Sequence, residues 1–391
     1  EEVSDTPIVR TVNLLIAQAV KDRASDVHIE PMRDRVRVRY RIDGTLHEVL
    51  SLPASAGPAL VSRIKVMAEM NLAERRHPQD GQLSFQVDGQ EVDIRVATAE
   101  SVYGEVVVLR ILNRRATFLT LQELGLSQEG LLVYQRLLKH PFGMILIAGP
   151  TGSGKTTTLY ASLNQMDREQ RNIMTIEDPV EYRFEGITQL QVSHRYGITF
   201  ATGLRALMRL DPDVILVGEI RDSDTAQIAT QAALTGHLVL SSIHANDSAS
   251  AVLRLLNLEV DRFIASASLL GVVAQRMVRR VCQHCAAPRE CSLEEQIAYR
   301  EITGEERSTF TYGEGCSFCG GTGFHGRTGI FELLEVNETI QRMVFEGAPA
   351  AQVREHAVQR GMVTMLQDGM RKASQGITTP AEVLRHVYGM T

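Results

Sequence analysis

The spacing of apolar residues changes along this chain, and each change predicts a different kind of element. Apolar residues from Ile8 to Val20 recur at helical spacing, which predicts a helix over 8–22, and a second helix is expected over 58–72. Asp43-Gly44 and Asp88-Gly89 are typical of hairpin turns between strands. Strands are predicted at 26–30, 33–43, 82–87, 91–99 and 104–112. Residues 1–112 therefore read as one α+β domain.

Short, continuous apolar runs replace this pattern beyond residue 126. Each run is followed by a stretch of helical spacing, and this alternation predicts a parallel α/β sheet. The predicted strands are 143–148, 172–177, 213–218 and 237–242. We expect a linker at 113–125, an α/β core at 126–276, a cysteine-bearing segment at 277–328 and a carboxy-terminal helical subdomain at 329–391.

Composition narrows the class of protein. The chain has 391 residues, which suggests two or three domains, and its formal net charge is -6. Its apolar runs are far shorter than the roughly 20 residues that cross a bilayer. No signal-like segment opens the sequence, so we expect a cytoplasmic protein. Because the sequence starts with Glu1 instead of methionine, we expect a cut or processed form.

A glycine-rich run carries the first candidate chemistry. It matches the phosphate-binding pattern G-x-x-x-x-G-K-[ST] and lies between a predicted strand and a predicted helix, which is the context that this motif requires. Lys155 would neutralise the β- and γ-phosphates, and the Thr156 hydroxyl would hold Mg²⁺. The residues expected to bind the nucleotide are Gly149, Pro150, Thr151, Gly152, Ser153, Gly154, Lys155, Thr156 and Thr157.

Polar residues end three of the predicted parallel strands, where ligands bind in open α/β sheets. Glu219 ends the run Asp-Val-Ile-Leu-Val-Gly-Glu and is assigned to Mg²⁺ or its water shell. Glu177 and Glu181 compete for the role of the base that orients water, and their spacing does not decide between them. His244 ends a further apolar run and is expected near the γ-phosphate.

Four of the five cysteines form two Cys-x-x-Cys pairs. Four thiolates in this pairing suit a tetrahedral structural Zn²⁺ with no position left for a substrate. His284 is a weaker candidate ligand, and Cys291 has no partner cysteine in the pattern. The predicted ligands are Cys282, Cys285, Cys316 and Cys319.

Five arginines alternate with apolar residues near the amino terminus. A strand would place all five on one face, either as a solvated or salt-bridged surface or as a surface for an anionic partner. These arginines are Arg33, Arg35, Arg37, Arg39 and Arg41.

Taken in order, the motifs resemble the secretion ATPases of type II secretion and type IV pilus assembly. The resemblance covers essentially the whole chain through GPTGSGKTT, TIEDPVE, DPDVILVGEIRD and GHLVLSSIH. It extends to ASDVHIEP, RYRIDG, RRHPQDG, QRMVRRVCQHC and GRTGIFELL. The tetracysteine segment separates the chain from the pilus retraction motors. The resemblance implies a PAS-like amino-terminal domain followed by a RecA-like P-loop ATPase domain.

The same resemblance implies roles for single residues. It favours Glu181 over Glu177 as the catalytic base, places Glu219 at the Mg²⁺ and places His244 at the γ-phosphate. Arg95 and Arg110 match the arginines with which the amino-terminal domain completes the site in this family. In the implied hexamer, the arginine-rich face of the first domain could approach a neighbour's nucleotide.

The implied partners are those of a secretion or pilus machine. They are other copies of the chain, an inner-membrane platform protein and a cytoplasmic docking protein, so the chain would lie in the cytoplasm, peripheral to the inner membrane. Full-length family members carry a further amino-terminal domain that docks to the membrane platform, and we expect this chain to begin after it. The motifs do not separate type II secretion from pilus extension or a DNA-uptake pseudopilus.

Two other classes of function compete with an ATPase motor. A RecA-like nucleic-acid translocase is disfavoured by the net charge of -6, the absence of Trp and an aromatic content of 5%, because single-strand tracks usually offer stacking residues. We therefore expect no nucleic-acid partner. A nucleotide switch without hydrolysis is disfavoured by the presence of Lys155, Thr156, Glu181 and Glu219.

Overall fold

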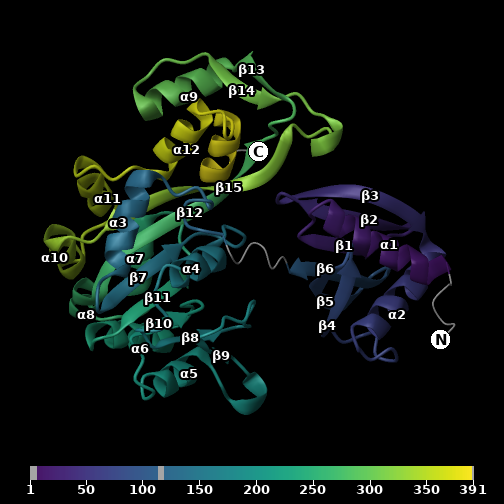
Figure 1. The fold of residues 1–391 in the computed structure, drawn as a ribbon, viewed down its shortest axis with the longest axis horizontal. Coiled ribbons are helices and arrows are strands. Elements are labelled where there is room, and N and C mark those ends of the chain that lie inside the picture. The colour runs from purple at the N-terminus through teal and green to yellow at the C-terminus, as the bar shows by residue number, and fades with distance from the viewer. Residues whose placement is uncertain (1–6, 113–118, 390–391) are drawn as a thin grey trace. The chain divides into compact units, whose positions relative to one another are not determined.

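The computed structural model describes residues 7–112 and 119–389 (Figure 1). The chain divides into two compact units, Glu1–Ala116 and Thr117–Thr391. Residues 113–118 of the expected linker lie outside the described residues.

The first unit is an antiparallel sheet with two helices on one face. The sheet has six strands in the order β3-β2-β1-β6-β5-β4. Its helical elements are α1 (Pro7–Lys21), the 3-10 helix η1 (Ala54–Ala56) and α2 (Gly57–Met67). Its strands are β1 (Asp26–Pro31), β2 (Arg35–Ile42), β3 (Thr45–Pro53), β4 (Gln79–Val87), β5 (Gln90–Ser101) and β6 (Gly104–Leu112).

Alternation along β2 explains this arrangement. Val36, Val38 and Tyr40 are buried against the helices, and the arginines between them point to the other face. Both predicted hairpin turns are confirmed: the two residues of Asp43-Gly44 and of Asp88-Gly89 have positive φ, as a type I′ turn requires. The prediction was wrong for Arg33, because β2 begins at Arg35. The helix predicted to reach residue 72 ends at Met67.

The second unit is built on a seven-stranded sheet in the order β15-β12-β7-β11-β10-β8-β9. The four predicted strands are confirmed as its parallel centre, and β15 alone of the described strands in this sheet runs antiparallel to its neighbour. The strands are β7 (Gly143–Ala148), β8 (Ile173–Glu177), β9 (Thr188–Gln191), β10 (Val214–Val217), β11 (Leu238–Ile243), β12 (Leu269–Val281) and β15 (Phe324–Glu335).

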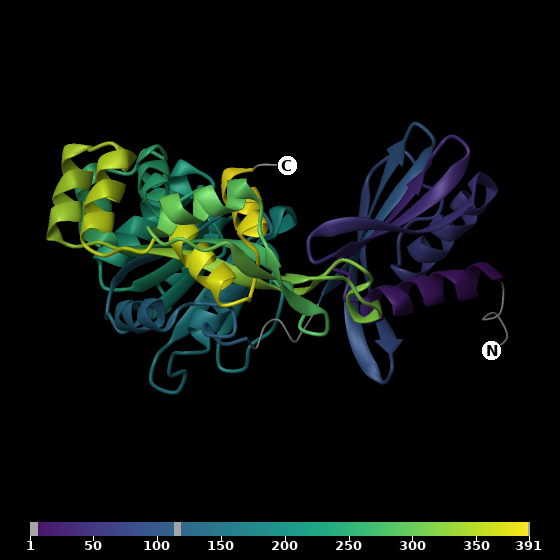
Figure 2. The ribbon, with the colours of Figure 1, turned by 90° about the horizontal axis from the view of Figure 1, so that it is seen from above.

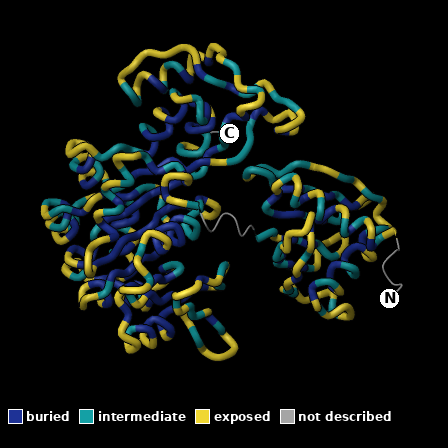
Figure 3. Tube along the Cα trace, in the orientation of Figure 1, coloured by how far each residue is buried: buried dark blue, intermediate teal, exposed yellow. Residues whose placement is uncertain are grey.

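Helices cover both faces of this sheet, so the four central strands β7, β8, β10 and β11 are buried along their whole length (Figures 1, 2 and 3). Along β7, Ile145 and Ile147 pack toward α3 and α4, whereas Met144 and Leu146 pack toward α5 to α8. The helices are α3 (Gln128–Leu138), α4 (Lys155–Leu163), η3 (His194–Tyr196), α5 (Phe200–Leu207), α6 (Ser223–Leu234), α7 (Ser248–Leu256) and α8 (Arg262–Ser268).

A small cysteine-bearing part follows β12, and four helices follow β15. The small part contains β13 (Ala286–Glu290), α9 (Leu293–Thr303), β14 (Thr309–Gly313) and η4 (Ser317–Cys319), with β13 and β14 paired antiparallel. The last helices are α10 (Glu338–Glu346), α11 (Ala350–Gln359), α12 (Met365–Ser374) and α13 (Pro380–Tyr388). The strand pattern missed β12 and β15. Residues 329–335, expected in the helical tail, belong to β15.

Candidate functional site

The glycine-rich run forms a loop between β7 and α4, as the motif predicts. Gly152 and Gly154 have φ of +78° and +86°, a conformation that favours glycine and lets the backbone close around an anion. Helix α4 begins at Lys155, so its free N–H groups face the loop. The Lys155 ammonium group donates to the carbonyls of Gly149 and Pro150 at 2.9 and 3.0 Å. It is therefore held across the loop, where a phosphate would lie.

A charged cluster accompanies the lysine. Burial lowers the pKa of Lys155, and the nearby Glu219 carboxylate opposes that shift. Glu219 follows β10 and has a side chain that is 17% exposed. Its carboxylate contacts Arg221 at 2.5 Å and the Nε2 atom of His244, after β11, at 3.5 Å. The structure thus brings Lys155, Glu219 and His244 together at the carboxyl edge of the sheet.

Arg221 was missed by the sequence reasoning, although it stands in the same motif as Glu219. Its hydrogen bond to Glu219 raises the pKa of the Arg221 guanidinium. The arginine is 61% exposed, so its remaining donors face solvent. The two-residue spacing after the strand could have suggested it, because both side chains leave the same strand end.

Glu177 and Glu181 have opposite environments. Glu177 ends β8 and is 3% exposed, and its carboxylate accepts hydrogen bonds from Tyr160, Thr175 and Gln189. Burial and the Glu177 carboxylate raise the pKa of Tyr160. Glu181 is exposed, and its backbone N–H donates to the Tyr160 hydroxyl at 3.3 Å. Tyr160 therefore links the buried glutamate to the segment that carries the exposed one.

The four predicted cysteine ligands converge, and all their sulfur atoms lie within 4.8 Å of one another. Three of the sulfur–sulfur distances are 3.8 to 3.9 Å. Four sulfurs at about 2.3 Å from a tetrahedral Zn²⁺ would be about 3.8 Å apart, so the cluster fits this ion. Burial opposes ionisation of Cys319, but the N–H groups of Cys316 and Gly323 outweigh it and lower its pKa to about 6. Cys291 lies outside the cluster.

The two candidate arginines of the first unit lie side by side. Arg95 on β5 pairs in register with Arg110 on β6, and Arg110 contacts Asp26 at 3.0 Å. On β2, Arg37 and Arg39 both contact Glu30, so this part of the face is salt-bridged. Arg35 pairs with Glu48 on β3. Arg95 and Arg110 belong to the first unit, and the other site residues belong to the second.

The phosphate loop lies between the parallel strand β7 and helix α4, and the Glu219 carboxylate follows β10, which is separated from β7 by β11 alone. This arrangement defines a P-loop ATPase. The comparisons with known proteins specify the family. The chain matches the type II/IV secretion system protein family over residues 1–385. It belongs to this family.

Relatives agree with this assignment, and solved structures have a similar fold. The type II secretion system protein HxcR of Pseudomonas aeruginosa is 47% identical over 379 residues, covering 97% of this chain and 77% of the relative. The type II secretion system ATPase E of Vibrio cholerae is 45% identical over 385 residues, covering 98% and 76%. The pilus retraction motor PilT with bound ADP has a TM-score of 0.64 at 26% identity, covering 95% of this chain and 96% of that one. The ATPase DotB of Legionella pneumophila, with a TM-score of 0.71 at 20% identity and coverage of 98% and 96%, shares the fold.

None of the helices in the two described stretches combines the length and the apolar character that a bilayer crossing requires.

Proposed function

We propose that the chain is a hexameric, Mg²⁺-dependent ATPase motor that powers assembly of a type IV pilus or a type II secretion pseudopilus. The observation that carries the proposal is the gathering of Lys155, Glu219, Arg221 and His244 beside the phosphate loop, in a chain of the secretion family. These are the charges that phosphoryl transfer needs around a transferred phosphate.

The binding step uses the backbone of the loop. The N–H groups of residues 151–157 and the start of α4 receive the phosphates, and Lys155 turns from the loop carbonyls to the β- and γ-oxygens. The Thr156 hydroxyl and Glu219 would hold Mg²⁺, Glu219 directly or through water. When bound, this ion neutralises charge on the phosphate oxygens.

The hydrolytic step uses the exposed glutamate. Glu181 accepts a proton from the attacking water, while Glu177, whose oxygens already accept hydrogen bonds, anchors Tyr160 and the segment that follows. His244 senses the γ-phosphate through Glu219. Arg95 and Arg110 supply positive charge to the site within the hexamer, as added arginines do in other phosphoryl-transfer enzymes.

The tetracysteine cluster holds a structural Zn²⁺ in this proposal. All four ligand positions are filled by protein thiolates, so the ion has no open position for a substrate. Its contribution is to hold together the two ends of the segment between β12 and β15, because one cysteine pair follows β12 and the other precedes β15.

The relatives of this chain are the basis for proposing the machine in which it works. Their names place them in type II secretion, so we propose that this chain works at the cytoplasmic side of the inner membrane, through a membrane platform protein and a cytoplasmic docking protein. We further propose that the first unit is a PAS-like domain and the core of the second a RecA-like domain.

Replacement of the proposed base tests the hydrolytic assignment. Glu181→Gln should lower steady-state ATP turnover by at least about 100-fold and leave ATP binding intact, because the amide cannot accept the proton. Glu185→Gln is the matched control, since it makes the same change at an exposed glutamate of the same segment. Turnover of Glu181→Gln within a few-fold of the parent chain would contradict the assignment.

A further inference from the structure

The side chain of Gln275 lies beneath the phosphate loop. Gln275 is on β12, which runs parallel to β7, and it is 1% exposed. Its amide nitrogen donates to the Ser153 carbonyl at 2.7 Å, and its amide oxygen accepts from the Thr158 hydroxyl at 2.8 Å. One buried amide thus ties the loop to the first turn of α4, with both of its ends engaged.

The loop rests closely on this part of β12. A Cβ atom on Gly149 would lie 2.6 Å from the Gln275 carbonyl oxygen, and one on Gly154 would lie 3.2 Å from the Gln275 amide nitrogen. Met277, two residues further along β12, would be 3.3 Å from the same Cβ atom of Gly154. The backbone of the loop therefore packs directly against β12, and this contact leaves the loop little room to change its conformation.

The contact to Ser153 also fixes the direction of the next peptide group. In a planar trans peptide, the C=O and N–H bonds point in opposite directions. Because the Ser153 carbonyl points to the Gln275 amide, the N–H group of Gly154 points away from that amide. This N–H is a donor of the kind that holds an anion in such loops.

We propose that Gln275 is a positioning residue for phosphate binding: it holds the loop in the conformation that presents its N–H groups to the nucleotide. The inference rests on the nucleotide binding proposed above. It assigns the positioning of the loop to a residue on β12, the strand beside β7. Gln275 is part of neither the phosphate-loop pattern nor the proposed metal sites.

Gln275→Met in the full chain is the most direct test. Methionine keeps the length and packing of the side chain but removes both hydrogen bonds. The dissociation constant for ADP and the KM for ATP should rise about tenfold, whereas kcat at saturating ATP should change less than threefold. The amides of residues 152–155 should exchange with solvent faster in the absence of nucleotide.

Two further variants separate positioning from simple stability. Thr158→Val removes one of the two contacts and should weaken ADP binding by about threefold, but it should add little in the Gln275→Met background. Thr230→Val removes a buried hydroxyl on α6 and should lower the thermal midpoint without changing ADP affinity.

The outcomes distinguish this inference from the proposed function. Failure of the parent chain to bind ADP would overturn the proposed function, while loop exchange would still report on Gln275. An ADP affinity of Gln275→Met within twofold of the parent, or loop amides that exchange at the parent rate, would overturn the positioning role.

Discussion

Two glutamates four residues apart show how burial separates an anchor from a reactive group. Glu177 is enclosed and accepts three side-chain hydrogen bonds, whereas Glu181 is exposed on the segment beyond the strand. A base must reach water and the γ-phosphate, so the exposed residue suits this role. Tyr160 connects the two, because its hydroxyl donates to Glu177 and accepts the N–H of Glu181.

Tyr160→Phe should therefore impair catalysis more than ATP binding. The change leaves the Glu177 carboxylate and the Glu181 N–H without their shared partner. We expect a loss of about 1–3 kcal/mol in the free energy of unfolding and a fall in kcat of about tenfold, with KM nearly unchanged. Steady-state turnover and chemical denaturation measure the two effects.

Tyr134→Phe provides the matched control. Tyr134 on α3 is also buried and bonds to Ser162 through its hydroxyl, but it has no contact with either glutamate in the described structure. It should lose stability and keep the parent kcat. An equal loss of kcat in both variants would show that Tyr160 acts through general stability alone.

The sequence predicted the loop, its lysine and the convergence of the cysteines, because each follows from a local motif. It did not distinguish Glu177 from Glu181, since two of the three hydrogen-bond partners of Glu177 come from other elements, Tyr160 on α4 and Gln189 on β9. Gln275 and Arg221 were missed for related reasons. Gln275 contacts the loop from β12, a neighbouring strand that is far from the loop in sequence. Arg221 lies in a motif whose chemistry was assigned to Glu219 alone.

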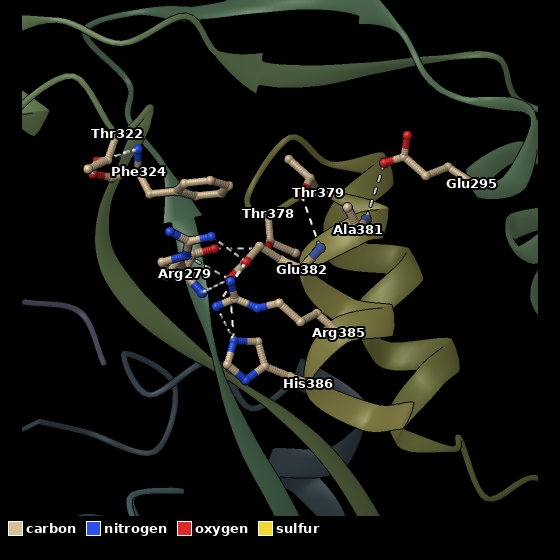
Figure 4. Close-up of polar contacts among 10 residues, drawn as sticks. All are labelled: Arg279, Glu295, Thr322, Phe324, Thr378, Thr379, Ala381, Glu382, Arg385 and His386. Carbon is tan, nitrogen blue, oxygen red and sulfur yellow. Dashed lines mark hydrogen bonds and ion pairs between the residues drawn. The ribbon is translucent and has the colours of Figure 1, made fainter. Parts of the chain in front are cut away.

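At the scale of elements, the last described helix is held to β12 by a buried charge cluster (Figure 4). Glu382 on α13 accepts from the backbone and guanidinium of Arg279 on β12, and Arg385 and His386 lie within 3.5 Å. Arg279 also packs over the Phe324 ring, at the start of β15. The cluster thus connects the helix to the two strands on either side of the cysteine-bearing part.

This cluster predicts an acid dependence of stability. Burial opposes ionisation of Glu382, but His386 and Arg279 outweigh it and lower its pKa to about 2. A carboxyl whose pKa falls on folding contributes stability above its unfolded pKa, and this stability is lost as the pH falls from about 4.5 toward 2. Glu382→Gln should be less stable than the parent by up to roughly 3 kcal/mol at neutral pH.

The difference between Glu382→Gln and the parent should shrink as the pH falls through that window. Thermal midpoints measured from pH 7 to pH 3 would show it. Glu306→Gln, at a glutamate with an 83% exposed side chain, should match the parent at every pH. A constant difference between Glu382→Gln and the parent would contradict the account of this ion cluster.

The cysteine-bearing part should depend on its metal. The parent chain, reconstituted with Zn²⁺, should hold one ion per chain and lose thermal stability on chelation. Cys282→Ser should lose the ion, whereas Cys291→Ser should retain it, because Cys291 is buried outside the cluster. Metal analysis and thermal unfolding decide this point. Equal zinc content in the two variants would contradict the assignment of ligands.

Strands β12 and β15 could not be predicted from the spacing of apolar residues. The first half of β12 is buried on both faces, and such an apolar run does not distinguish a strand from a buried helix. Its antiparallel partner β15 begins more than 40 residues later, beyond the cysteines. The pairing is decided by contacts across the fold, whereas the two hairpins of the first unit carry their turn residues between adjacent strands.

At the scale of the whole molecule, the residues proposed to act in ATP hydrolysis belong to both units of the chain. The second unit contains the phosphate loop, both glutamates, Glu219 and His244, while Arg95 and Arg110 belong to the first. The proposal that the arginines act in catalysis therefore requires that a first unit meet a second unit within the assembly. This requirement links turnover to oligomeric state, because the assembly would complete the site.

Steady-state ATP hydrolysis with Mg²⁺, measured beside light scattering and with or without single-stranded DNA, tests the central claim most directly. We predict slow hydrolysis that requires Mg²⁺, rises as hexamers form and is unchanged by DNA. Strong stimulation by DNA would contradict the account in favour of a nucleic-acid translocase. Absence of turnover in a confirmed hexamer would contradict it in favour of a nucleotide-binding scaffold.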